Sequence, residues 1–338
     1  MVLRAPAAAG AAVPFAVGAP FRVGPDLLRL DARHPDDPHP GLLVVDDQRP
    51  LWLGRKRAHL DDRRRPLVRV AAGASDPRLR RALAGGLAAL AAAHPDIVAQ
   101  AASPGTYRLL PAGLTVHPEA AAVSADGPEA ATLAQRLADE APVPRVLAAV
   151  SLALQEDLVL MGWPGDGPAG QPGDPAAAAG LVALAGSVIA PSGWDPAERI
   201  GQPLAALHAP VGDGDRLRLA SLALSRAMVD KGPYVRYVWS LAGDASPARW
   251  PGDPAPPAEP FADLSDLWFR AERQVTLPLP AAGASLFLIR VLVAPLLEVA
   301  ADAARRARLV ASLRSMSEAV IAYKHLASAR ERVLAAWG

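Results

Sequence analysis

The sequence predicts an α+β fold, in which an antiparallel sheet is flanked by helices and followed by a helical C-terminal tail. The clearest strand patterns are 267–277 and 284–293, which read as a hairpin around the turn 278–283. Strands gather in the middle and late chain, and the helical patterns lie outside them. This segregation is typical of α+β folds and not of a βαβ array.

The length and composition allow one large or two ordinary domains. The chain has 338 residues, of which 51% are hydrophobic. The pattern divides it into three parts. Residues 1–145 form a helical or irregular region that either wraps the core or stands as a separate domain. Residues 146–295 form the core, and residues 296–338 form C-terminal helices.

The charge balance excludes several classes of partner. Lys plus Arg number 35 against 34 Asp plus Glu, so the net charge is +1 and no overall field favours nucleic acid or an anionic membrane. The absence of cysteine excludes disulfides, thiolate-ligated metals and iron–sulfur clusters. No apolar run approaches the roughly 20 residues of a membrane span. No secretory signal pattern is present, so we expect a cytoplasmic protein.

The first third of the chain carries two clear helix signals. Ser75-Asp76-Pro77 opens a helix that runs to about Ala93, and Asp126-Gly-Pro128 opens another to Asp139. Residues 21–31 alternate weakly, as a strand or an extended arm. The basic segment 55–69 contains two aspartates and is interpreted as a solvated helical face.

Residues 144–190 change in character. An apolar helix over 144–154 is followed by a strand to Met161, and 181–190 is either a helix end or a strand. Three glycines at 165, 167 and 170 match the spacing G-x-G-x-x-G. The prolines around them prevent a helix from opening at the third glycine, so we interpret the segment as a linker.

The stretch 191–211 combines helix signals with a lone histidine. Asp195-Pro196 is a capped helix start, and a second helical turn begins at Pro203. His208 then shares an apolar stripe with Leu204 and Leu207.

The remaining elements follow from simple patterns. We expect an amphipathic helix over 215–229, a strand over 234–241 and a long surface loop over 243–260. The helical tail breaks at Ser315–Glu318, which has capping-box spacing.

Histidine spacing does not support a metal site built from several histidines. None of the seven histidines pairs with another at a ligand spacing. His208 differs from the others because an imidazole on an apolar stripe needs a hydrogen bond or a ligand. Two readings stay open, a satisfied core histidine and a metal ligand.

Charged residues interrupt both strands of the hairpin. Alternation sends Glu272 and Gln274 to one face of the sheet and Arg273 to the other. Either that face is solvated, or Glu272 is a buried carboxylate that needs a partner. Arg290 repeats the pattern, and its partner is either an external anion or Glu272.

The same segments resemble the haem-dependent oxidative N-demethylase family, which includes the haem subunit of bacterial dimethylamine monooxygenase. The resemblance covers about 150–295, with weaker matches at 21–31 and at Tyr323-Lys324. It rests on these motifs: Gln155-Glu156-Asp157-Leu158, Pro191-Ser192-Gly193-Trp194, Ile200-Gly201-Gln202-Pro203-Leu204, His208-Ala209-Pro210-Val211, Trp239-Ser240-Leu241, Glu272-Arg273-Gln274, Leu279-Pro280, Gly283 and Phe287-Leu288-Ile289-Arg290.

The resemblance implies haem b in a PAS-like α+β domain, with His208 as the axial ligand of the iron. Trp194 belongs to a matching motif and is a candidate for cofactor binding. Arg273 and Arg290 are candidates for the haem propionates by charge.

An alkylammonium substrate needs a carboxylate or an aromatic face. Glu272 and Asp157 are therefore catalytic candidates, with Trp239 as a cation–π alternative.

The implied reaction is a monooxygenation that converts a small methylated amine and O2 into the shorter amine and formaldehyde. Electrons must come from a separate reductase, because the chain has neither a cysteine cluster nor a credible dinucleotide loop. A non-catalytic haem- or ligand-binding PAS-like sensor or scaffold is the alternative, and a haem-free relative is a third reading. The chain departs from the family pattern at 212–214, 275–279 and 288, which leaves a shifted substrate, altered partner docking or lost catalysis open.

Overall fold

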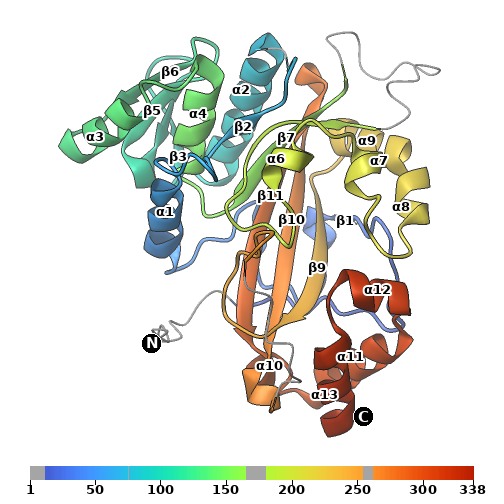
Figure 1. Cartoon of the computed structure of the whole chain (residues 1–338). Coiled ribbons are helices and arrows are strands. Elements are labelled where there is room, and N and C mark those ends of the chain that lie inside the picture. Colours follow the sequence, from blue (N-terminus) through green and yellow to red (C-terminus); the bar gives the residue numbers. More distant parts are fainter. Residues whose placement is uncertain (1–11, 75, 165–179, 254–261) are drawn as a thin grey trace.

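The computed structural model describes residues 12–74, 76–164, 180–253 and 262–338. A seven-stranded antiparallel sheet runs through its centre in the order β1-β9-β10-β11-β7-β8-β2 (Figure 1). In that order the strands are Leu28–Arg29, Tyr234–Ala242, Trp268–Leu279, Ala284–Pro295, Asp157–Gly162, Val182–Ser187 and Arg69–Val70. The predicted α+β class and the hairpin of β10 and β11 are confirmed.

Short helices connect and cover the strands. The α-helices are α1 (Arg49–Ala58), α2 (Asp76–Ala93), α3 (Pro128–Arg136), α4 (Pro142–Ser151), α6 (Pro196–Arg199), α7 (Leu204–Leu207), α8 (Asp215–Leu219), α9 (Ser221–Asp230), α10 (Leu296–Val299), α11 (Ala303–Ser315), α12 (Glu318–Tyr323) and α13 (Ala327–Trp337). The 3-10 turns are η1 (Leu30–Ala32), η2 (Leu110–Ala112), η3 (Leu264–Asp266) and η4 (Pro280–Ala282). Among the described residues, no helix is both long enough and apolar enough to cross a bilayer.

A second sheet lies in the N-terminal region, where the sequence indicated only helical or irregular structure. It has four antiparallel strands in the order β3-β4-β5-β6, with bounds Val98–Gln100, Tyr107–Leu109, Leu114–His117 and Ala122–Ala125. Strands of three or four residues hold too few alternations to be recognised by periodicity. The division of the chain into three parts stays a prediction.

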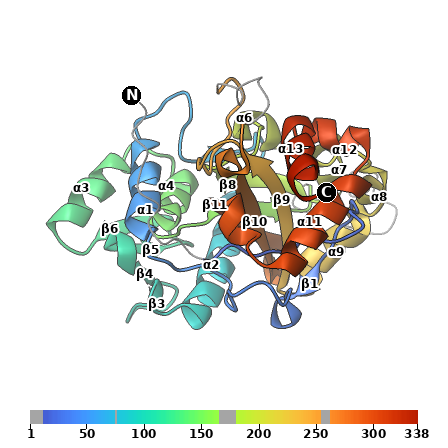
Figure 2. The same ribbon diagram turned by 90° about the horizontal axis from the view of Figure 1, so that it is seen from below.

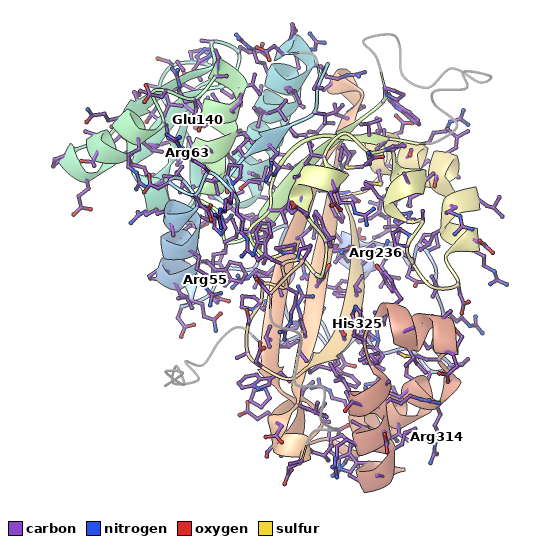
Figure 3. All side chains as sticks on the ribbon, viewed as in Figure 1. Arg55, Arg63, Glu140, Arg236, Arg314 and His325 are labelled. Carbon is purple, nitrogen blue, oxygen red and sulfur yellow. The ribbon has the colours of Figure 1, made fainter. Side chains whose placement is uncertain are left out.

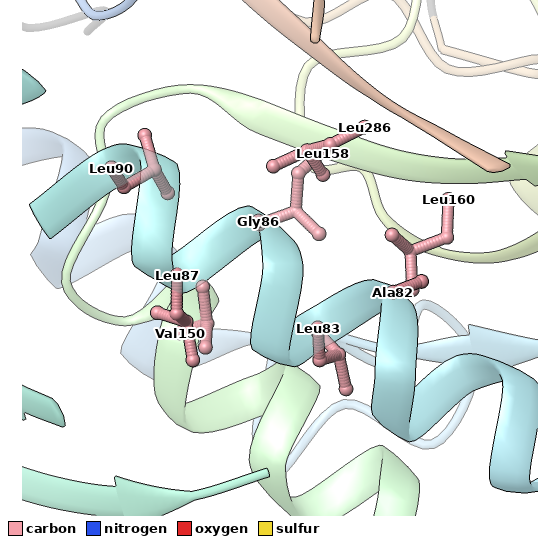
Figure 4. A pocket seen from close by; sticks show the side chains of 9 residues that line it. All are labelled: Ala82, Leu83, Gly86, Leu87, Leu90, Val150, Leu158, Leu160 and Leu286. Carbon is pink, nitrogen blue, oxygen red and sulfur yellow. The ribbon is translucent and has the colours of Figure 1, made fainter. Parts of the chain in front are cut away.

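The two faces of the large sheet are covered differently (Figure 2). The core face packs on α2 and α4 through aliphatic side chains such as Leu158 and Leu286. Figure 4 shows a small pocket at this junction, lined only by Ala, Gly, Val and Leu, which makes it a gap in the packing of α2 and not a polar ligand site. The opposite face, which we call the site face, packs on α7 and α9 through Val159 and Met161.

Cross-strand register assigns each polar side chain of the hairpin to one face. Glu272 pairs with Val238 and Val291, whereas Arg273 pairs with Tyr237 and Arg290. Since directly opposite residues point to the same side, Glu272 lies on the site face and Arg273 with Arg290 on the core face. The predicted alternation is confirmed.

Several sequence-based boundaries hold and others need correction. The helices from Asp76 and Pro128 and the strand over 181–190 are present. The single helix expected over 215–229 is two helices that meet at Ala220. Ser317, and not Ser315, caps α12 by accepting the Val320 amide at 3.2 Å. The glycine segment 165–170 lies outside the described residues.

The segment 55–69 is not simply a solvated face, because Lys56 is completely buried. Its ammonium group donates to the carbonyls of Ser151 at 3.1 Å and Leu154 at 2.9 Å, and also to that of Glu156. These carbonyls lie between the end of α4 and the start of β7. Lys56 therefore fastens α1 to the sheet, and burial lowers its pKa to about 8.

Candidate functional site

Glu272 lies at the centre of the polar residues on the site face. Its Oε1 accepts a hydrogen bond from Arg270 at 2.8 Å and another from the Ser192 hydroxyl, and its Oε2 accepts one from Gln274 at 2.7 Å. Burial alone raises the pKa of this carboxyl, but Arg270 and the three hydrogen bonds outweigh it and hold the pKa below its usual value. Glu272 is therefore a charged, oriented carboxylate that already has a cationic partner.

Asp157 positions the loop that brings Ser192 to Glu272. Its two oxygens accept the backbone amides of Ile189 at 3.0 Å and Ala190 at 2.9 Å. Only 1% of Asp157 is exposed, and burial raises the pKa of its carboxyl. Both oxygens are engaged with backbone, so the structure gives Asp157 an anchoring role next to the site.

The loop that carries Trp194 ends in the predicted helix cap. The Asp195 side chain accepts the Ala197 amide at 2.8 Å and so opens α6, as the sequence predicts. Trp194 is half-buried against the apolar cluster of α7, α9 and the site face. The same cluster contains Leu204 of α7, the helix that His208 follows.

His208 follows α7 directly and carries an unpaired imidazole. Its Nδ1 is buried without a hydrogen-bond partner, and its Nε2 makes no hydrogen bond with any described residue. Desolvation, reinforced by the positive charge of Arg236, lowers the pKa of His208 to about 4. The side chain is thus a neutral imidazole at neutral pH, which is the form that ligates metals.

Arg236 lies on the site face of β9, and Figure 3 labels it beside that strand. It pairs across the sheet with Gln274, next to Glu272. Its guanidinium forms no hydrogen bond or ion pair within the described part of the chain, and its Nε is buried. Burial lowers its pKa, while Asp26, Glu272 and Tyr323 act on it at longer range.

Tyr323 and Lys324, at the end of α12, lie near the polar residues around Glu272. Lys324 donates to the Trp239 carbonyl at 2.7 Å. Desolvation lowers the pKa of Lys324 to about 8 and raises that of Tyr323, and Glu272 acts on both side chains. The weak sequence match at Tyr323-Lys324 therefore lies within electrostatic range of Glu272.

A contact between loops holds α12 against the segment after His208. The Ser317 hydroxyl donates to Asp213 at 2.6 Å. A Cβ on Gly212 would lie only 2.6 Å from the Ala319 carbonyl oxygen, so the two backbones approach closely. The departure from the family pattern at 212–214 thus falls where α7 meets the C-terminal helices.

The other predicted site residues lie on the core face. All three side-chain nitrogens of Arg273 are engaged: Nε with Asp37 at 2.9 Å, and the others with backbone carbonyls of 39–42. Arg290 donates to Asp46 at 2.7 Å, and its guanidinium lies 4.4 Å from the Trp52 ring centroid. Asp46, and not Glu272, is thus the partner of Arg290.

Trp239 also faces away from Glu272. Its ring stacks on Phe269 with a centroid distance of 5.9 Å, and Phe21 meets it edge-on. The ammonium of Lys324 lies 6.0 Å from the ring centroid, so a cation of the chain itself already occupies a cation–π position.

Sequence reasoning did not single out Arg236, Arg270 or Ser192. Arg236 had a detectable signal, because it is a lone charge inside an apolar strand, as Arg290 is. The sequence does not show that Arg236 lacks a partner, because this depends on contacts between distant segments. Among the described residues, no group of three or more His, Asp or Glu side chains could hold a bare metal ion.

Comparison with known proteins gives one family. The sequence model described as haem-dependent oxidative N-demethylase, alpha subunit-like, matches residues 115–334, which is more than half of the chain. A search of curated proteins gave no match.

Proposed function

Since the chain belongs to the haem-dependent oxidative N-demethylase, alpha subunit-like family, we propose that it binds haem b on the site face and removes a methyl group from a small methylated amine. The observation that carries the proposal is the unpaired, neutral imidazole of His208, which lies inside the matched region and within electrostatic range of Arg236. We further propose that the large sheet and α6–α9 form a PAS-like haem-binding core.

The residues of the site face fit a haem group. His208 offers a nitrogen lone pair that no described residue uses, as a ligand of the haem iron would require. Trp194 packs against the apolar cluster that also contains Leu204 of α7. Arg273 and Arg290 fit the propionates less well than the sequence indicated, because each has partners on the core face.

The chain's own residues would orient the amine. Oε2 of Glu272 accepts only the Gln274 bond and so keeps room for a further donor such as an alkylammonium N–H. Asp157 and Ser192 hold that carboxylate in place through the 189–192 loop. Trp239 stacks on Phe269 of β10, on the core face of the sheet, and so supports the strand that carries Glu272.

Haem, when bound, supplies the reductive activation of O2 and the oxidation of an N-methyl C–H bond. In total, the methylated amine, O2, two electrons and two protons give water and a carbinolamine. The carbinolamine then splits into formaldehyde and the shorter amine. We propose that the electrons come from a separate reductase, since the chain has no cysteine with which to hold an iron–sulfur centre of its own. The family description names an alpha subunit, which agrees with an assembly of several chains.

The pairing of Glu272 with Arg270 favours a second candidate, a haem-binding protein without amine turnover. A carboxylate that already holds a guanidinium attracts an ammonium less strongly than a free one. Formaldehyde release separates the two functions, and the haem spectrum tests both.

The first experiment is an absorption spectrum of the protein after reconstitution with haem. We expect a Soret band in the wild type and a shift of its position in the single-substitution variant His208→Ala. A wild-type chain without a Soret band contradicts haem binding, and a spectrum unchanged by His208→Ala contradicts the axial role. Formaldehyde release from dimethylamine is then measured with a surrogate electron donor. Turnover no faster than that of free haem contradicts catalysis on this substrate.

A further inference from the structure

Arg236 stands apart from the other large cations on the site face and in the sheet. Arg270, its neighbour on the same face, donates to Glu272 at 2.8 Å and to the Pro247 carbonyl at 3.0 Å. Arg273 and Arg290 each reach an aspartate. Arg236 reaches no acceptor in the described part of the chain, and its Nε is buried.

Arg236 is half-buried and its Nε is fully buried, so its guanidinium loses part of its hydration and gains no anion in return among the described residues. Burying an ionic group without a partner loses its hydration and returns nothing. Glu272 does not serve as that partner, because its hydrogen bonds come from Arg270, Ser192 and Gln274 and, within the described part of the chain, none comes from Arg236. Asp26 acts only at a distance and is exposed to solvent.

The local charges point the same way. Three cations, Arg236, Arg270 and Lys324, lie within electrostatic range of Glu272, and the buried carboxyl of Asp157 also interacts with it. The charge of Arg236 also acts on His208. The charge that acts on His208 is thus positive, which favours a ligand that carries negative charge next to Arg236.

We propose that Arg236 binds a carboxylate group of the ligand held at His208. The inference rests on the proposed function. Two sources present such a group: a propionate of haem, and the carboxylate of an N-methylated amino acid used as substrate. Both would form charge-assisted, potentially bidentate hydrogen bonds with the guanidinium.

The first arm of the test compares two porphyrins. Wild type and Arg236→Met are titrated with haem and with haem dimethyl ester, in which both propionates are esterified, and the Soret band reports binding. If Arg236 holds a propionate, the substitution weakens haem binding about tenfold or more, by the loss of a charged hydrogen bond. It leaves the binding of the ester unchanged.

The second arm addresses the substrate. The haem-loaded proteins are titrated with N,N-dimethylglycine and with dimethylamine, and the shift of the Soret band is followed. If Arg236 holds a substrate carboxylate, Arg236→Met weakens the response to N,N-dimethylglycine about tenfold or more, with the response to dimethylamine unchanged.

Thermal unfolding without ligand tells a binding role from a structural one. Arg236→Met is expected to raise the Tm, since it removes a half-buried charge that has no partner in the described part of the chain. The matched variant Arg270→Met is expected to lower the Tm, since it leaves Glu272 without its cation. A fall in Tm for both variants assigns Arg236 to the fold and overturns the inference.

The outcomes separate this inference from the proposal on which it rests. Wild-type protein that binds no haem overturns both. Haem and N,N-dimethylglycine binding that are each unaffected by Arg236→Met overturn the inference alone and leave the proposed function standing.

Discussion

Lys56 gives an unusual prediction, that the stability of this protein rises with pH in the alkaline range. The ammonium is fully buried, and desolvation lowers its pKa from 10.5 to about 8. Below pH 8 both the folded and the unfolded chain hold the proton, and the full cost of the buried charge is present. Between pH 8 and 10.5 the folded chain loses the proton while the unfolded chain keeps it. The free energy of unfolding therefore increases across this window.

The magnitude follows from the two pKa values. One pKa unit corresponds to about 1.36 kcal/mol, so the shift of Lys56 is worth about 3 kcal/mol between pH 8 and 10.5. Lys324, whose pKa is also lowered to about 8, adds a similar rise that Lys56→Met leaves in place. The contribution of Lys56 is thus the difference between wild type and Lys56→Met.

The assay is urea unfolding at a series of pH values from 7 to 10.5, with wild type and Lys56→Met in parallel. We expect the wild-type free energy of unfolding to climb more steeply, by about 3 kcal/mol over the window. Lys56→Met also removes the hydrogen bonds to three buried carbonyls, which lowers its stability. Carbonyls do not titrate, so this loss is the same at every pH and does not affect the difference in slope between the two proteins. Parallel profiles for the two proteins would refute the assigned pKa shift.

Three further substitutions test the scaffold around the site. Asp157→Asn replaces one of two acceptor oxygens by a donor that faces a backbone amide, and should cost about 1–3 kcal/mol in urea unfolding; an unchanged midpoint argues against the anchoring role. Arg273→Met strands the buried carboxylate of Asp37 and should cost about 3–5 kcal/mol, against less than about 1 kcal/mol for the more exposed pair broken by Arg249→Met; equal losses contradict this reasoning. Gly212→Ala forces apart two touching backbones and should lower the Tm by an amount that corresponds to about 1–3 kcal/mol; a higher Tm means that the approach is looser than described.

Local patterns were enough to locate most elements of the large sheet. The hairpin of β10 and β11 follows from two apolar runs around a Pro- and Gly-containing turn, and β9 from simple alternation. The same alternation assigned Glu272 and Arg273 to opposite faces. It could not detect β3–β6, since strands of three or four residues are defined by their partners more than by their own sequence.

In the candidate site, the sequence likewise showed some residues and not the contacts between them. His208 and Glu272 were recognisable because each is a polar residue in an apolar pattern, and such residues need partners. The partners were not recognisable. Arg290 meets Asp46, 244 positions away in sequence, and Arg273 meets Asp37 across 236 positions. No local rule relates residues at such separations.

The sequence by itself determined the α+β class, the main strands, the opposite sides of the sheet that Glu272 and Arg273 face, and the few polar residues that need an explanation. Only the tertiary structure decided which partner each of these polar residues has. It gives Glu272, Arg273 and Arg290 partners within the chain, and among the described residues it gives His208 and Arg236 no hydrogen-bond partner. The physical reason is that periodicity records a residue's own burial, whereas hydrogen bonds and ion pairs depend on which distant segments the fold brings within reach.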